Sequence, residues 1–361
     1  MSTTPTGEPR RANVSGLGLI GGSIGKGLRA RGWQVGGHDL DPVRLARARE
    51  IGAIDRAGLD PDAEVTFVAA PVLALPEAIG HALASTNGLV SDVGSVKGSV
   101  TSVVDDDRFI GGHPMAGSEL DGIDGADADM FAGAVWVLTP TARTPDTAFG
   151  ALTAIVRSLG AEVVALSPER HDALVAIVSH VPHLTAATLM ALADARAEEH
   201  GALLRLAAGG FRDMTRIASG HPAIWPDICT TNRDAILVGL DGLIAGLSGV
   251  RDIVARADRE SLLQLLTRAR VARANLPTSA ARPSELAEVR IPIPDRPGAA
   301  AEVFTLAAEL GVNVFDFEVA HSAEGTKGVL IAVIAVGHGE LFRGGLIARG
   351  FRPSVMRLEL E

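Results

Sequence analysis

The residues of this chain best suited to catalysis form a heptapeptide that begins at His113 and reads HPMAGSE. It follows, after about ninety residues, a glycine-rich fingerprint that begins at Gly16 and reads GLGLIG. A histidine beside a proline and a run of small residues suits a loop that holds an imidazole at the rim of a pocket. Imidazole changes charge near neutral pH and can therefore serve as a general base. A single histidine is more often structural, so the rest of the chain has to decide between the two roles.

The glycine fingerprint predicts what fills such a pocket, because GxGxxG between a strand and a helix binds the pyrophosphate of a dinucleotide. We expect Gly16 to make the turn, Gly18 to let the backbone approach the pyrophosphate, and Gly21 to allow close helix packing. Asp39 follows the last glycine by about 18 residues, at the end of the next predicted strand. An aspartate there accepts hydrogen bonds from the ribose hydroxyls and repels a 2′-phosphate, and no arginine follows it immediately. NAD is therefore predicted rather than NADP; the alternative, a glycine turn with no ligand, gives Asp39 no role.

A polar segment that contains Ser95 follows the predicted strand at 88–92. In an open parallel sheet the carboxyl ends of the strands form the ligand-binding edge, so Ser95 is placed to orient a bound ligand. The alternative is that its hydroxyl merely caps the next helix. The two roles are compatible.

The helical stretch 168–195 carries a line of polar side chains among apolar ones. At about 100° per residue, Asp172, Ser179 and His183 fall within about 40° of one another on a regular helix. Pro182 bends that helix and frees a backbone carbonyl one turn earlier. Such a line is either a buried network or a pocket wall. For His183 alone a core role would be favoured, whereas the line of three favours a pocket wall.

The segment GGFRDMTRIA at 209–218 contains Arg216 and is followed by Trp225. Arginine is the side chain that binds a carboxylate through two parallel hydrogen bonds. Helix arginines usually face solvent, and that is the alternative for Arg216 taken alone. Together with the other segments, it is our candidate for binding a substrate carboxylate.

Five motifs spread over residues 16–218 together resemble the prephenate/arogenate dehydrogenase family of tyrosine biosynthesis: GLGLIGGS, DVGSVK, HPMAGSE, HDALVAIVSHVPH and GGFRDMTRIA. The departures are a valine at position 181, where leucine is commoner, and a polar first strand; neither affects the chemistry. The resemblance implies NAD-dependent oxidative decarboxylation of prephenate, a small molecule, to 4-hydroxyphenylpyruvate. The alternative within the family is arogenate, which would give tyrosine directly.

The resemblance also implies a role for each candidate residue. His113 would act as the base on the ring hydroxyl, with Ser95 helping to orient it. Arg216 would pair with a substrate carboxylate, while Ser179 and His183 would line the substrate pocket. The residues near the mouth of that pocket would be Glu119, Asp172 and Trp225.

Two other classes of protein share part of this pattern. β-Hydroxyacid dehydrogenases resemble one another in using a lysine of a helical second domain as the acid/base. Residues 98–326 of this chain contain no lysine, which argues against that class. A non-catalytic NAD-sensing or amino-acid-sensing protein would not need His113, Ser95 and Arg216 together. Within the family, the ammonium group of arogenate would favour a nearby carboxylate. Residues 173–193 contain no acid, which favours prephenate.

Structural elements must position these residues. Short apolar strands alternate with helical stretches over residues 12–166, which predicts an α/β domain with a Rossmann-like parallel sheet. Residues 167–274 are rich in alanine and leucine and predict an all-helical domain for substrate binding and dimerisation. After a polar first strand, the expected strands of the sheet are 33–38, 65–70, 88–92, 108–111, 135–139 and 162–165.

The C-terminal part is separated by residues 275–284, NLPTSAARPS, which have the composition of a linker. Residues 285–361 predict the order strand, helix, strand, strand, helix, strand, and with their DRPG turn they resemble the ACT domain, an α+β module that binds amino acids. The resemblance implies an aromatic amino-acid effector whose carboxylate meets the helix start at Gly298, near Asn313. The alternative is a dimerisation module without a ligand.

Composition excludes several kinds of partner. The 361 residues carry a net charge of −10, which argues against nucleic acid and anionic membranes. One cysteine, Cys229, rules out an internal disulfide framework and fits a reducing cytoplasm. Residues 1–11 form a polar tail without a signal-peptide core, and the apolar run 235–250 is too short to span a bilayer. We expect a cytoplasmic homodimer without a metal site.

Overall fold

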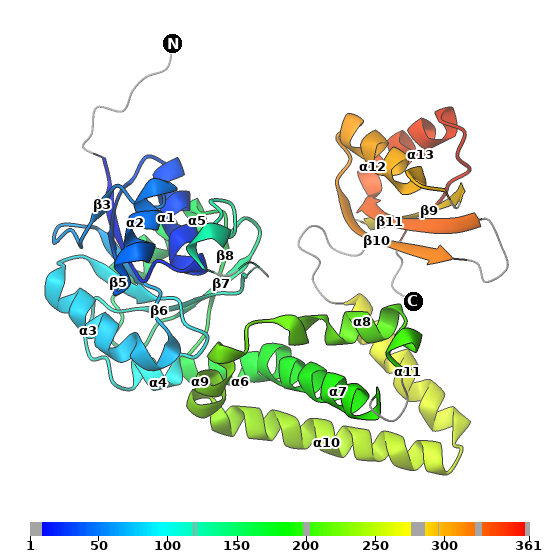
Figure 1. The fold of residues 1–361 in the computed structure, drawn as a ribbon, viewed down its shortest axis with the longest axis horizontal. Coiled ribbons are helices and arrows are strands. Elements are labelled where there is room, and N and C mark those ends of the chain that lie inside the picture. Colours follow the sequence, from blue (N-terminus) through cyan, green and yellow to red (C-terminus); the bar gives the residue numbers. More distant parts are fainter. Residues whose placement is uncertain are drawn as a thin grey trace. The chain divides into compact units, whose positions relative to one another are not determined.

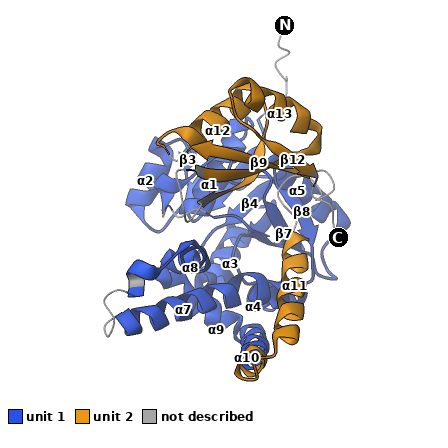
Figure 2. Ribbon diagram, turned by 90° about the vertical axis from the view of Figure 1, so that its right-hand side faces the viewer, with its two compact units in different colours: residues 1–248 blue, residues 249–361 orange. Residues whose placement is uncertain are grey.

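The structure is a computed structural model that describes residues 9–117, 120, 122–197, 203–275, 286–294, 296–321 and 327–357. The chain divides into two compact units, residues 1–248 and 249–361, which are described separately (Figure 2). Three sequence-based expectations lie outside the described residues: Glu119, most of the polar tail and nearly all of the linker.

A five-stranded parallel sheet in the first unit confirms the Rossmann-like fold (Figure 1). The strand order is β3-β2-β1-β4-β5, so the chain reverses its direction of travel across the sheet after β3. Ligands of such sheets bind at this switch point, beyond the carboxyl ends of the strands. The strands are β1 (Arg11–Ser15), β2 (Gln34–His38), β3 (Arg56–Ala57), β4 (Val65–Val68) and β5 (Leu89–Asp92). The helices of this region are α1 (Leu19–Ala30), α2 (Pro42–Glu50), α3 (Leu75–Ser85) and α4 (Gly98–Thr101).

The polar character of β1 comes from a satisfied hydrogen-bond network around Asn13, which is fully buried. Its side-chain amide donates to the carbonyl of Asp60 at 2.9 Å and to Thr66 Oγ1 at 3.1 Å. Its Oδ1 accepts the backbone N–H of Asp60 at 2.8 Å. A buried amide whose donors and acceptor are paired does not weaken a central strand.

A second, three-stranded sheet corrects one predicted strand. The sequence predicted a strand at 108–111 in a single parallel sheet, but β6 (Gly111–Pro114) lies three residues later and runs antiparallel to β7 (Val135–Thr139). Hydrophobicity pointed to Phe109 and Ile110, whereas the ladder runs through two glycines that give no apolar signal. Glycine is required at position 112, because a Cβ there would lie 2.7 Å from the carbonyl of Asp92. The remaining elements are β8 (Glu162–Ala165), which is parallel to β7, and α5 (Asp146–Ser158).

Helices make up the rest of the first unit, as predicted. They are α6 (Pro168–Val175), α7 (Val181–Ala197), α8 (Gly209–Thr215), α9 (Trp225–Thr231) and α10 (Arg233–Ala255). A π-helical turn, Ala176–His180, joins α6 to α7. Pro182 has no N–H to give to the carbonyl of Val178, so the regular hydrogen-bond ladder cannot continue through this point. The wider turn changes the direction in which side chains on either side of it project.

Large apolar side chains remain exposed on these helices: Val178 (66%), Leu192 (59%), Val238 (73%) and Ile244 (60%). By length and composition alone, the stretch Pro168–Ala197 is apolar enough to cross a membrane. The same stretch carries His171 and Asp172, whose side chains bond to β6 and to the start of α4. These bonds tie the stretch to the three-stranded sheet and to α4. The exposed apolar surface is of the kind that protein partners cover.

The second unit begins within the last part of α10, includes α11 (Arg259–Ala274) and continues with a four-stranded antiparallel sheet, ordered β10-β11-β9-β12. Alternate residues of its central strands, such as Ile291 and Leu330, are fully buried against Val303 and Phe342 of its two helices. The elements are β9 (Leu286–Pro294), α12 (Ala299–Glu309), β10 (Val314–His321), β11 (Lys327–Ala335), α13 (Gly339–Ala348) and β12 (Ser354–Arg357).

Candidate active site

The glycine turn between β1 and α1 has the geometry that a dinucleotide requires. Gly16 has φ +90°, and a Cβ there would lie 2.3 Å from the carbonyl oxygen of Ala69. A Cβ on Gly21 would lie 1.9 Å from the carbonyl oxygen of Gly16. At Gly18, by contrast, a Cβ would meet no atom within 4 Å. Two glycines are thus needed for the turn itself, and the third leaves open backbone at the N-terminus of α1, where a pyrophosphate is stabilised.

Asp39 lies at the end of β2 and holds this turn together. Its carboxylate accepts the N–H of Leu17 at 2.7 Å and that of Asp41 at 2.8 Å. The Arg44 guanidinium lies 3.3 Å from both of its oxygens. A ribose hydroxyl would replace the long Arg44 contacts on these oxygens, and the acid at the end of β2 beside the open glycine turn fits NAD. The sequence analysis missed Arg44, because it considered only the residues that follow Asp39 immediately.

His113 lies in β6 rather than in the predicted loop, and a buried ion pair anchors the residue before it. The Lys97 ammonium is fully buried, pairs with Asp92, and donates to the carbonyl of Gly112 at 2.7 Å. Asp92 accepts the N–H of Gly112 at 3.2 Å and that of Gly94 at 2.9 Å. Burial lowers the pKa of Lys97, while the Asp92 carboxylate opposes this shift. Both backbone groups of Gly112 are therefore fixed, and with them the position of His113.

A second histidine, which the sequence analysis did not single out, bonds directly to the first. His113 Nδ1 lies 2.8 Å from His171 Nε2, and His171 Nδ1 lies 2.8 Å from Asp172 Oδ1. Asp172 also accepts the backbone N–H groups of Lys97 and Gly98, each at 2.8 Å. His171 is fully buried and Asp172 is 9% exposed.

These contacts correct two sequence-based expectations. Asp172 was expected near the pocket mouth, on one helical face with Ser179 and His183, but it lies behind His171. The regular 100° spacing does not hold through the π-helical turn, so the line of three is broken. Ser95 is half-buried and makes no capping bond to α4 in the described part of the chain; Asp172 caps that helix instead.

Burial lowers the pKa of His113 well below its usual value of 6.5, and the neighbouring His171, Lys97 and His180 lower it further. The imidazole is therefore neutral across the physiological pH range. A neutral imidazole has one nitrogen with a lone pair and can accept a proton there.

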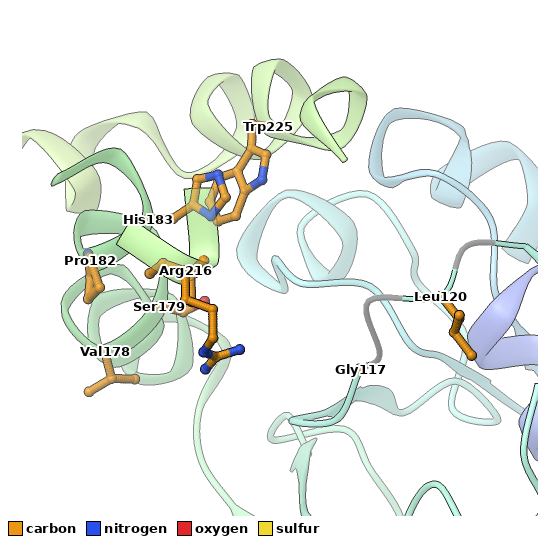
Figure 3. Close-up of a pocket in the computed structure, with 9 residues that line it drawn as sticks. Gly117, Leu120, Val178, Ser179, Pro182, His183, Arg216 and Trp225 are labelled. Carbon is orange, nitrogen blue, oxygen red and sulfur yellow. The ribbon is translucent and has the colours of Figure 1, made fainter. Parts of the chain in front are cut away.

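Four of the predicted site residues do come together, around a cavity of about 830 Å³ (Figure 3). His183 stacks on Trp225 with ring centroids 3.6 Å apart and planes 13° apart, which gives the cavity a flat aromatic wall. Figure 3 shows Arg216 extending from the helical wall toward the side where Gly117 lies. Neither Ser95 nor His113 lines this cavity, although His113 precedes Gly117 in the same segment. The lining residues are Gly117, Leu120, Val178, Ser179, Pro182, His183, Arg216, Ile217 and Trp225.

A buried pair that the sequence analysis also missed supports this wall. His180 is 1% exposed, and its Nδ1 lies 3.2 Å from the side-chain nitrogen of Asn232. That nitrogen also donates to the carbonyl of Asp172 at 2.9 Å. Burial lowers the pKa of His180 to about 4. Asn232, which precedes α10, thus bonds both to α6 and to the last residue of the π-helical turn. The available signal in the sequence was a second histidine within HDALVAIVSHVPH.

In the C-terminal unit, Gly298 precedes α12 with φ +87° and lines a cavity of about 250 Å³. Asn313 is exposed before β10 and does not line that cavity. The expected meeting of Gly298 with Asn313 at one site is therefore not seen.

The open glycine turn at the switch point of a parallel sheet places this chain in the class of Rossmann-type dinucleotide-binding proteins. Residues 24–165 match the family model described as prephenate dehydrogenase, nucleotide-binding domain, and residues 167–268 match prephenate dehydrogenase, dimerization domain. The chain belongs to the prephenate dehydrogenase family.

Individual relatives agree with this assignment. The prephenate dehydrogenase of Bacillus subtilis (strain 168) is 32% identical over 335 residues, which covers 88% of this chain and 90% of the relative. Among solved structures, the prephenate dehydrogenase of A. aeolicus in complex with hydroxyphenyl propionate and NAD⁺ is 27% identical, with a TM-score of 0.70 over 75% of this chain and 100% of the other. The arogenate dehydrogenase of Synechocystis is 31% identical, with a TM-score of 0.63 over 74% of this chain and 100% of the other.

Proposed function

We propose that the protein oxidises and decarboxylates prephenate to 4-hydroxyphenylpyruvate with NAD⁺, in tyrosine biosynthesis. The observation that carries the proposal is a half-buried histidine that is held in β6, in the same segment as Gly117, which lines a cavity with an arginine and an aromatic wall. The family and its relatives support it.

In this mechanism His113 accepts the proton of the ring hydroxyl, and Ser95 orients that hydroxyl. Arg216 binds a substrate carboxylate, while Ser179 and His183 line the site. The glycine turn and Asp39 would hold NAD⁺, which would supply the hydride-accepting chemistry for the carbon that bears the hydroxyl. Loss of carbon dioxide then makes the ring aromatic, which renders the reaction irreversible. The protein contributes position and charge, since the cofactor supplies the redox chemistry.

The test is a pair of kcat/KM values for NADH production, with prephenate and with arogenate. The absence of acids at 173–193 favours prephenate, whose side chain has a keto group in place of the ammonium. A higher kcat/KM for arogenate would show instead that the protein is an arogenate dehydrogenase, like the Synechocystis protein to whose structure this chain is similar. No NADH with either substrate would favour a sensing protein instead.

A first prediction concerns the cofactor. Because the Asp39 carboxylate repels a 2′-phosphate, we expect NAD⁺ to be preferred over NADP⁺ by at least tenfold in kcat/KM, about 1.4 kcal/mol. Arg44 acts in the opposite sense, since a guanidinium attracts that phosphate. Arg44→Ala should therefore lower the residual use of NADP⁺ further. Equal use of the two cofactors by the native protein would remove Asp39 from this role.

We further propose a division into residues 12–166, 167–274 and 285–361, and a homodimer formed through the helical domain. The matched model is itself described as a dimerization domain, and the helices expose Val238, Ile244 and Leu247 by more than half. Surface of this kind fits an obligate interface. The single cysteine supports a cytoplasmic location.

The C-terminal unit, we propose, is an ACT-like regulatory domain for an aromatic amino acid. The sheet order and the cavity beside the start of α12 support this proposal. A helix N-terminus stabilises a carboxylate, and Gly298 keeps the approach open because a Cβ there would meet no atom within 4 Å. Since Asn313 does not line this cavity, its part in effector binding would require a second subunit.

The second prediction separates catalysis from regulation. A chain that ends near Ala281 should fold and keep its activity but lose inhibition by tyrosine or phenylalanine, an effect of about 1–3 kcal/mol. The A. aeolicus structure in complex with NAD⁺ is matched over 100% of its own length but covers only 75% of this chain. This difference supports the division. Within the full chain, Ala300→Asp should mimic truncation by repelling the effector carboxylate, and α12 tolerates an acid in its first turn. Ala300→Asn is the neutral control. Equal inhibition of the truncated and native proteins would place the effector at the active site.

A further inference from the structure

His113, His171 and Asp172 form an unbroken line of hydrogen bonds from β6 into the protein interior. Both links measure 2.8 Å. The two imidazole rings meet edge to face, with centroids 5.1 Å apart and planes 72° apart. This arrangement suits a bond between a ring N–H and the lone pair of the next ring, and does not suit stacking. The direction of the bond between His113 and His171 depends on which ring nitrogen of each carries the hydrogen.

Backbone N–H groups that bond to Asp172 determine the positions of these hydrogens. Asp172 accepts two N–H groups at the start of α4, one on each oxygen, so its oxygens are acceptors. His171 Nδ1 must therefore carry a hydrogen and donate it to Asp172. In neutral His171 the other nitrogen, Nε2, then has the lone pair, and His113 Nδ1 must donate to it. His113 Nε2 is left as the unprotonated nitrogen of the catalytic ring.

We propose that His171, backed by Asp172, is a proton relay that fixes the tautomer of His113 and takes over the proton His113 receives. The proposal rests on the proposed function of His113 as the base. His171 and Asp172 do not touch the substrate in it; they are positioning residues.

The hydroxyl O–H bond of the substrate breaks and a bond from that proton to His113 Nε2 forms. The Nδ1–H bond of His113 breaks and its proton bonds to His171 Nε2. His113 ends neutral, with its hydrogen on the opposite nitrogen, and His171 ends as an imidazolium paired with the Asp172 carboxylate. The hydride goes to the nicotinamide cofactor that the proposed reaction already employs.

The surroundings explain why a relay is needed. The charged and titratable groups that face His113 are Lys97, Asp92, His171 and His180, and the Lys97 cation is already neutralised by Asp92. No described carboxylate bonds to His113 itself. A buried imidazolium at this position would be costly, and a proton acceptor with a strongly lowered pKa is a weak base. At His171 the same positive charge would have Asp172 as its direct partner.

Two substitutions of His171 distinguish its two proposed functions, which are to fix the tautomer of His113 and to accept the proton from His113. His171→Phe removes both functions and leaves the Asp172 cap of α4 intact; we expect kcat to fall about 30-fold or more, with KM little changed. His171→Gln keeps an oxygen that accepts the N–H of His113 and an amide that donates to Asp172, but it cannot take up a proton. It should recover only part of the loss.

The pH profile gives a readout that a structural defect would not move. The acid limb of kcat/KM reports protonation of His113, whose pKa the neighbouring His171 lowers. In His171→Gln that influence is absent, so the limb should move to higher pH. The control is His338→Gln, which removes an exposed histidine of the C-terminal unit. It should keep kcat within threefold and leave the limb in place.

The native protein offers a measurement that does not depend on turnover. With ¹⁵N-labelled histidine, NMR distinguishes a ring protonated on Nδ1 from one protonated on Nε2, and the His113→Asn spectrum identifies the His113 signals. We expect both His113 and His171 to carry the hydrogen on Nδ1 at neutral pH. A native His113 protonated on Nε2, or a His171→Gln protein with native kcat and an unmoved acid limb, would overturn the relay. Absence of prephenate oxidation by the native protein would instead refute the proposed function, and the tautomer would still be measurable.

Discussion

We expect His113→Asn to lower kcat for prephenate by at least ~10²-fold while KM stays within about threefold, because a general base contributes ~10²–10⁴ in rate and acts mainly as the proton moves. Asparagine keeps a polar side chain in β6 but has no basic nitrogen. The anchors of Gly112, namely Lys97 and Asp92, do not depend on the imidazole, so the strand should keep its place. Steady-state kinetics on native and variant protein provide the measurement, with the unfolding temperature as the control for folding. A kcat within threefold of native would mean that the base is another group.

The same hypothesis fixes the pH range of activity. Burial lowers the pKa of His113, so the neutral form that accepts a proton persists below pH 6.5, and activity should be lost only as pH falls further. The acid limb of kcat/KM in the native protein should accordingly lie below pH 6.5. An acid limb above pH 7 would contradict a buried, neutral histidine at this position.

Local sequence signals predicted much of the fold. The strands at 135–139 and 162–165 have the predicted bounds, because each is a short apolar run between clear breaks. At Gly21 the steric need is local, since a Cβ there would lie 1.9 Å from the carbonyl oxygen of Gly16. At Gly16 the need comes from Ala69, which is distant in the sequence, and the position was predicted from the spacing of the glycines alone. The two strands and Gly21 depend on neighbours in the chain, and for that reason the sequence contains them.

Features that depend on distant contacts were not predictable in the same way. The strand β6 runs through Gly111 and Gly112, which let neighbouring segments approach its backbone closely and which contribute no hydrophobic signal. The regular helical wheel placed Asp172 beside Ser179, and it failed because a π-helical turn separates them. His171 stands next to Asp172 in a quoted motif, yet its role depends on a bond to a strand 58 residues away in sequence.

We expect Arg216 to contribute to substrate binding, whereas His113 contributes to proton transfer. It begins the short turn Arg216–Ser219 after α8 and lines the cavity together with Ser179 and the His183–Trp225 stack. Prephenate carries carboxylates, and a guanidinium binds a carboxylate through two parallel hydrogen bonds. The aromatic wall lowers the local polarity, which strengthens such a pair.

Arg216→Ala should therefore raise KM for prephenate about 30-fold or more, corresponding to the loss of ~2–4 kcal/mol from a charged two-point contact in a desolvated pocket. We expect kcat to change far less, because the contact is made equally in the bound substrate and in the transition state. Arg216→Lys should recover only part of the affinity, since an ammonium lacks the planar fork. The matched control is Arg212→Ala, which removes an exposed arginine from α8 that does not line the cavity and should leave KM unchanged. If KM for prephenate is the same in Arg216→Ala as in the native protein, Arg216 is an ordinary solvent-facing arginine, and the substrate carboxylate binds elsewhere.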